Sequence, residues 1–403
     1  MRTSALGLLL VVCACTGRES REATVYSDSA GVRIAVSDHR NPNWSRTQTW
    51  VLRHPPRLQL GNMPYDMSHQ LYGVMHARRL RDSRIAVANS GVGDVRVYGA
   101  DGNIVQTIEM PERGTGGNAP MRVEQLGGDS LLVVTTDGSL LIFDGAGNQL
   151  ARSRLAPLTD LKAEPEIVGA FRDGTLLVHA VHPDDPAASG VGRRQVRLLR
   201  YAANGQLLGS FGDLGGQAIL HGEKGVYIFA PSAQYVAADS TIWYAGADHY
   251  EAREIAPGGR TLRIVRLDRQ GGRVLQEDIV AYRHAAKRQA TGTSDEATID
   301  AVLENSVFAE TFPAFDQIRL DEAGNLWLRN YRWFDMGGGK AWSVFHADGR
   351  YLGEVRTPAS TEVYQIGPDF LVGRMSTSGG LEAVYLWDLD KPGAARAGSP
   401  SPG

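Results

Sequence analysis

Short apolar runs separated by turns rich in Asp, Gly, Asn or Ser recur along most of the chain. The stretch Arg78–Ile108 shows the full pattern: an apolar run, a tight turn, a second apolar run, a loop, an alternating strand, a Gly turn and a final strand. Such strands and turns are typical of a four-stranded antiparallel meander, which is one blade of a β-propeller. The pattern therefore predicts a repeated blade.

The pattern occurs six times, and its last copy is one strand short. The six segments are 78–108, 123–155, 167–211, 235–267, 317–355 and 364–389. The second strands carry consecutive apolar residues, as strands covered on both faces do, which argues against a single open sheet. We predict an all-β fold over residues 24–391, a six-bladed β-propeller of four-stranded antiparallel blades.

Two strands expected before the first blade bear on how the ring closes. They are Val32–Val36 and Trp50–Leu60, and Pro55 and Pro56 interrupt the second. Proline inside a strand belongs at a sheet edge, because it has no N–H to donate. Since the last repeat lacks a strand, we predict that Trp50–Leu60 supplies it and closes the propeller.

One segment between the fourth and fifth blades departs from the β pattern. Residues 276–290 and 295–307 have helical spacing, so we predict a helical insertion at about 274–312. Ile299, Val302 and Leu303 should share one face of the second helix, and Thr293 with Glu296 forms a possible capping box at its start. Residues 392–403 are rich in Gly, Ala, Ser and Pro, which predicts a disordered tail.

The N-terminus has the features of a secretory signal. Arg2 precedes a short apolar run, Ala5–Val12, and small Ala14 precedes Cys15. The run is too short to span a bilayer. This ending resembles the lipobox of bacterial lipoproteins, in which the chain is cut before a Cys that carries a lipid. An ordinary cleaved signal with an incidental Cys is the alternative.

The resemblance to a lipobox implies a signal peptide at 1–14, a lipid on Cys15 and a tether at 15–23. Thr16, rather than Asp, follows the Cys, which in such lipoproteins implies the outer membrane, facing the periplasm. A lipidated Cys15 would leave no thiol in the mature chain for a disulfide, a zinc ion or nucleophilic attack. We expect no cofactor beyond this lipid.

The charge balance gives little information about partners. The 42 basic and 45 acidic residues nearly cancel, so no strongly basic field is present to attract nucleic acid. We expect a monomer attached to the membrane through its lipid, with a protein, peptide or glycan as the ligand. With its recurring turns and its lipobox, the chain resembles bacterial six-bladed β-propeller lipoproteins related to the NHL and TolB-like propellers. This resemblance implies a fold but no activity.

Loop lengths predict which face binds a ligand. In a four-stranded meander the first and third turns lie at one end, here called the short-turn face, and the longer connections lie at the other, the long-loop face. The short-turn face should be flat. The long segments expected at that end are 181–195, 212–232, the helical insertion within 268–313, and 330–340. Long loops are commonly functional, so we predict a ligand site at the long-loop mouth of the channel. Its candidate residues are His182, Asp185, His249, Tyr331, Arg332 and Trp333. The alternative for Tyr331 and Trp333 is that they simply pack between blades.

Two functions stay open at this point. The first is an envelope propeller that binds a ligand or a protein without turning it over, because no catalytic motif is visible. The second is a hydrolase, lactonase-like, with a metal at the channel mouth held by residues scattered over several blades. His179 and His182 could ligate one metal only if the chain bends at Pro183, because positions three apart in a strand point to opposite faces.

Overall fold

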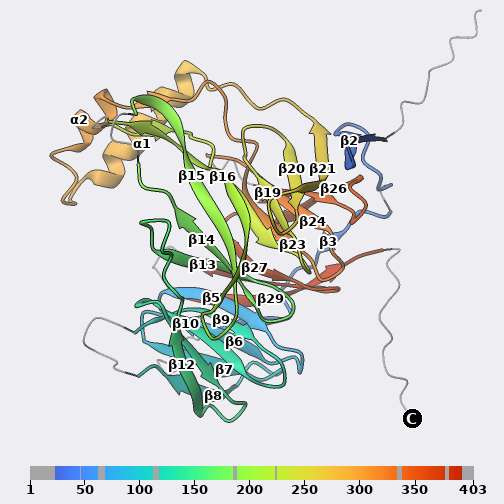
Figure 1. The fold of residues 1–403 in the computed structure, drawn as a ribbon, viewed down its shortest axis with the longest axis vertical. Helices are drawn as coiled ribbons and strands as arrows, with labels where there is room; N and C mark the ends of the chain where they lie inside the picture. The colour runs from blue at the N-terminus through green and yellow to red at the C-terminus, as the bar shows by residue number, and fades with distance from the viewer. Residues whose placement is uncertain are drawn as a thin grey trace, which may run out of the picture.

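The chain folds into a ring of six β-sheets, which confirms the predicted six-bladed β-propeller. Figure 1 shows the computed structural model, which describes residues 23–45, 47–61, 69–111, 118–184, 188–222, 225–333, 338–376 and 381–392. The signal peptide, Cys15 and residues 393–403 of the tail lie outside this part. Among the described residues, no helix combines the length and apolarity needed to cross a membrane.

Blades one to three are four-stranded antiparallel sheets formed by consecutive strands. Blade one consists of β5 (Val74–Arg79), β6 (Ile85–Asn89), β7 (Asp94–Tyr98) and β8 (Ile104–Glu109). Blade two consists of β9 (Pro120–Gln125), β10 (Leu131–Thr135), β11 (Ser139–Phe143) and β12 (Gln149–Arg154). Blade three consists of β13 (Pro165–Ala170), β14 (Leu176–Val181), β15 (Gly190–Tyr201) and β16 (Leu207–His221).

Blades four to six are also formed by consecutive strands, and strands of the N-terminal segment are added to blades four and six. Blade four has β18 (Gln234–Ala237), β19 (Ile242–Ala245), β20 (Glu251–Ile255) and β21 (Thr261–Asp268). Blade five has β23 (Phe315–Leu320), β24 (Leu326–Asn330), β25 (Lys340–Phe345) and β26 (Tyr351–Thr357). Blade six has β27 (Glu362–Ile366), β28 (Phe370–Ser376) and β29 (Glu382–Asp390).

The N-terminal segment closes the ring, as predicted. Strands β3 (Val51–Leu52) and β4 (Leu58–Leu60) both pair antiparallel with β29, on either side of the interruption at Pro55 and Pro56. The same segment does more than the sequence predicted. Strand β2 (Val32–Asp38) runs parallel to β21 at the outer edge of blade four, and β1 (Thr24–Ser29) pairs with β2.

The apolar core lies between neighbouring blades. All five residues of β6 are buried, as are all five of β10. One cluster joins Ile85 and Val87 of blade one to Phe370 and Val372 of blade six. The consecutive apolar residues of the second strands are therefore explained by burial on both faces.

The helical insertion is present between blades four and five. Helix α1 (Gln276–Ala290) has the predicted bounds, and Leu303 of α2 (Ile299–Glu304) is buried. The predicted capping box is wrong: α2 begins at Ile299. The Thr293 hydroxyl instead donates to the carbonyl of Ala290, and Glu296 accepts from the N–H of Gly292, so both stabilise the preceding turn.

Part of the expected long loops is regular structure. Residues 190–195 and 215–221 were expected in loops, but they extend β15 and β16 into a long hairpin. This hairpin rises toward the helical insertion (Figure 1). Beside it, β17 (Tyr227–Ile228) pairs parallel with β22 (Val307–Phe308), which joins the connection before blade four to the end of the insertion.

Candidate functional site

A central cavity of about 720 Å³ lies in the channel of the propeller. Residues of the first strands of the blades line it, because these strands lie against one another around the axis. The turns between first and second strands form its mouth, including Arg172, Asp239 and Glu322. The cavity therefore opens on the short-turn face. The turns there are short, but the prediction of a flat face is wrong, because the channel is not filled by side chains.

The inner wall of the central cavity is polar, although each first strand also faces an apolar core. Polar residues occur two positions apart, so their side chains share one side of the strand. The pairs are His76 and Arg78 on β5, Arg122 and Glu124 on β9, and Glu362 and Tyr364 on β27, and Arg319 projects from β23. Four blades thus contribute ionisable groups to one space.

Glu124 is the centre of a network in this wall. Its carboxylate is 2.7 Å from Nη1 of Arg78 and 3.0 Å from Nη1 of Arg122. Burial opposes ionisation of the carboxyl, but the two guanidinium charges outweigh that effect and hold its pKa below its usual range. Glu124 is therefore ionised and shared by two cations.

His76 is held as a neutral imidazole beside this pair. Nη1 of Arg122 lies 3.3 Å from Nε2 of His76, and a guanidinium can only donate, so Nε2 accepts. Nδ1 then carries the proton and donates to the carbonyl of Val123 at 3.1 Å. Burial, followed by the charge of Arg122, lowers the pKa of His76 to about 3. The ring is uncharged at neutral pH.

Arg319 is the least compensated cation of the inner wall. Its Nε donates to the carbonyl of Val363 at 3.0 Å, and its Nη1 donates to the carbonyl of Ile318 at 2.8 Å. The carboxylate of Glu362 is 3.9 Å away from Nη2, beyond hydrogen-bonding distance, and lies equally far from Arg329. Burial lowers the pKa of Arg319 to about 10, and Arg122 and Arg329 repel its charge. The group stays charged at neutral pH.

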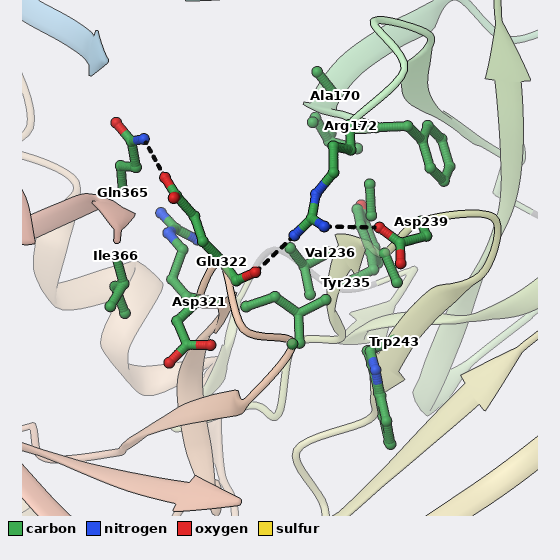
Figure 2. A pocket seen from close by; sticks show the side chains of 18 of the residues that line it. Ala170, Arg172, Tyr235, Val236, Asp239, Trp243, Asp321, Glu322, Gln365 and Ile366 are labelled. Carbon is green, nitrogen blue, oxygen red and sulfur yellow. Dashed lines mark hydrogen bonds and ion pairs between the residues drawn. The ribbon is translucent and has the colours of Figure 1, made fainter. Parts of the chain in front are cut away.

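Arg172 crosses the mouth of the central cavity. Nη2 of Arg172, from blade three, donates to the carbonyl of Glu322 in blade five at 2.8 Å, and Nη1 lies 3.6 Å from Asp239 of blade four (Figure 2). The Glu322 carboxylate accepts from Gln365 at 3.1 Å. Because the Arg172 side chain is 65% exposed, these contacts lie at the surface and contribute little stability.

The other carboxylates at the mouth are paired. Glu254 is 2.9 Å from Arg263, and buried Asp321 is 2.9 Å from Nζ of Lys391. Arg263 and Lys391 therefore balance the negative charge of these two carboxylates, and neither cation belongs to the inner wall.

The residues predicted at the long-loop mouth lie elsewhere and in separate places. His182 is 3.1 Å from Asp213 at the base of the β15–β16 hairpin. His249 is exposed and lines a smaller cavity of about 130 Å³ in the loop between β19 and β20. Asp185 lies outside the described residues. His179 contacts Glu166 and Tyr235, so it shares no partner with His182.

Residues 331–333, on the long-loop side, contribute to the core of the helical insertion. Tyr331 and Trp333 pack in a cluster with Phe229, Tyr282 and Phe312, and Arg332 between them is exposed. Both aromatic residues are therefore packed, but against the helical insertion and not between blades as the alternative had it. None of the described candidates lines the central cavity. Ligand binding at the long-loop mouth stays a prediction.

Sequence reasoning missed the residues of the central cavity. A signal was present, because pairs such as His76 and Arg78, or Arg122 and Glu124, place charge two positions apart in strands that begin a blade. Among the residues with described positions, no three His, Cys, Asp or Glu side chains gather as a metal site would require.

Fold and cavity define the class of this chain as a six-bladed β-propeller with a polar central pocket. No known family model and no curated protein matches the sequence. The solved structures that resemble it include virginiamycin B lyase from Staphylococcus aureus, which is 9% identical with a TM-score of 0.41. That match covers 84% of this chain and 99% of the lyase. A calcium-binding protein, regucalcin, from Agrobacterium tumefaciens is 13% identical with a TM-score of 0.39, and the match covers 79% and 92% of the two chains.

Proposed function

We propose that this chain is a binding module that takes a small ligand, or a segment of a protein, peptide or glycan, into the central cavity. One observation carries the proposal: ionisable side chains from four blades converge on an open space of about 720 Å³. Ligand sites in proteins usually occupy about 300–1,000 Å³ and use a few precisely placed polar groups. The proposal moves the ligand from the long-loop mouth to the short-turn mouth.

A comparison of the two mouths tests this proposal. The mature protein is purified under native conditions, and co-purifying small molecules are identified by mass spectrometry. Arg78→Ala should reduce the occupancy or affinity of such a ligand, because Arg78 lines the central cavity. Arg332→Ala, on the opposite side, should leave it unchanged. The reverse pattern at equal folded stability would return the site to the long-loop mouth.

We further propose that the module is monomeric and attached to the cell envelope through a lipid on Cys15, at the outer membrane and facing the periplasm. The support is the short apolar run followed by Ala14 and Cys15 in the sequence. Cys15→Ser should abolish processing and release the protein from the membrane fraction. Unchanged membrane attachment of that variant would contradict the lipid anchor.

The alternative function, a metal-dependent hydrolase, has its own test. The purified protein is analysed for divalent metals before and after chelation. A stoichiometric metal, lost together with a hydrolytic activity on chelation, would favour the hydrolase over the binding module.

A further inference from the structure

We propose that Arg319 and Arg78 form an anion-binding subsite in the central cavity, for a ligand that carries a carboxylate or phosphate group. The inference rests on the proposed binding function and names the chemical class of its ligand. The charges, the free N–H donors and the enclosure of the inner wall support it.

The positive and negative charges of the inner wall do not balance. Three guanidinium groups, those of Arg78, Arg122 and Arg319, face the carboxylates of Glu124 and Glu362. Arg78 and Arg122 share Glu124, while Glu362 lies 3.9 Å from Arg319 and is also shared with Arg329 and Gln317. Within the inner wall the guanidinium groups therefore exceed the carboxylates by one charge, which a bound anion would neutralise, whereas the carboxylates of Asp239 and Glu322 lie at the mouth.

Arg319 and Arg78 both have N–H donors that no described acceptor uses. A guanidinium has five N–H donors. Among the described contacts, Arg319 uses Nε and one N–H of Nη1, and Arg78 donates through Nη1 to Glu124. Nη2 of Arg319 therefore has no acceptor within hydrogen-bonding distance in the described part of the chain. Arg122 has fewer donors to spare, because Glu124, His76 and the carbonyl of Val168 already accept three of its N–H groups. Arg319 and Arg78 therefore offer more hydrogen bonds to a ligand than Arg122 does.

The two arginines belong to one connected group of side chains that is partly enclosed by the protein. Arg78 and Arg122 share Glu124, and Arg122 also contacts His76 at 3.3 Å. The ring of His76 lies 5.3 Å from that of Tyr364, which is two residues from Glu362, the carboxylate that faces Arg319, and all of these residues line the central cavity. The Arg319 side chain is only 27% exposed, so its charge is partly removed from bulk water. A poorly paired cation in such a place is costly, and a carboxylate or phosphate that accepts two parallel N–H groups offsets that cost.

Calorimetric titration of the purified mature protein tests the subsite with defined probes. The probes are inorganic phosphate and succinate, each titrated at constant ionic strength, with succinamide as the uncharged analogue of succinate. Phosphate or succinate should bind and succinamide should not. The two anions separate phosphate from carboxylate preference, because the one that fits the subsite should bind at least severalfold more tightly.

Four variants test whether Arg319 binds the anion. Arg319→Gln should weaken binding of the preferred anion at least tenfold, and Arg319→Lys, which keeps the charge but loses the planar fork, should weaken it less. Glu362→Gln should strengthen binding, because it removes the carboxylate that competes for Arg319. Arg260→Gln is the matched control, since Arg260 is exposed in an outer turn of the same face and should leave affinity unchanged.

Two outcomes would overturn the inference. One is binding of phosphate or succinate that is equal in the wild type and in both Arg319 variants, at equal folded content by circular dichroism. The other is binding of succinamide as tight as that of succinate. If an uncharged ligand co-purifies and depends on Arg78 but not on Arg319, the proposed function stands and the anion subsite fails. If neither co-purifying ligand nor probe depends on any cavity residue, both fail.

Discussion

Substitution of Leu60 tests how much the closing strand contributes to the stability of the ring. Leu60 lies on β4, opposite Val384 of β29, and is 1% exposed in the cluster that joins blades six and one. Leu60→Ala removes buried methyl groups and leaves a cavity, which costs about 2–5 kcal/mol at well-packed sites. We expect about 3 kcal/mol, because backbone pairing with β29 limits how far the site can collapse.

Urea unfolding followed by tryptophan fluorescence measures this loss close to where it occurs. Trp50, Trp327, Trp342 and Trp387 lie in the cluster shared by blades five and six and the closing segment, so their emission reports on closure. Leu150→Ala on β12 is the control, because Leu150 is 61% exposed and should cost less than about 0.5 kcal/mol. A Leu60 variant no less stable than the Leu150 variant would refute the view that this strand closes the ring.

Two further predictions concern single residues, and a third concerns the closing segment. The pKa of His76 lies below that of the unfolded chain, so stability should fall as pH drops from about 6.5 toward about 3, by up to about 1.4 kcal/mol per pH unit from this group. His76→Asn should flatten that part of the curve in denaturation measured from pH 7.5 to 4.5, and an unchanged slope would contradict a neutral buried ring. Gly205→Ala should cost several kcal/mol more than Gly258→Ala by the same assay, because both have positive φ but only a Cβ at 205 would lie 1.9 Å from the Arg154 carbonyl oxygen. Equal losses would mean that strain alone sets the cost. Deleting residues 50–60 should prevent a stable monomer, and size-exclusion chromatography showing a well-folded monomer would contradict closure by this segment.

The elements that sequence predicted well depend on local periodicity. Helix α1 has the expected bounds because its spacing is set within its own fifteen residues, and the turn glycines at 102, 147, 205, 259 and 349 all have positive φ. The start of α2 failed because Thr293 and Glu296 had a competing local use, the turn that ends α1.

The central cavity could not be predicted in the same way. Its partners are far apart in sequence: His76 contacts Arg122, and Arg319 faces Glu362, and only ring closure brings the two pairs into one channel. Loop length drew attention to the other face, where Tyr331 and Trp333 fill the core of the insertion. A search for charged pairs two positions apart at the start of each blade would have been a better guide.

The route of the N-terminal segment has a consequence for the order of folding. Strand β2 lies on β21, Asn43 and Trp44 bond to the backbone of β26, and β3 and β4 pair with β29, so every strand that receives this segment begins at residue 261 or later. At about 5–20 residues per second, roughly 20–70 s of synthesis separate β2 from β29. The ring stays open for that interval. A chain that is exported, as proposed here, therefore cannot form its closed ring before its last blade has been made.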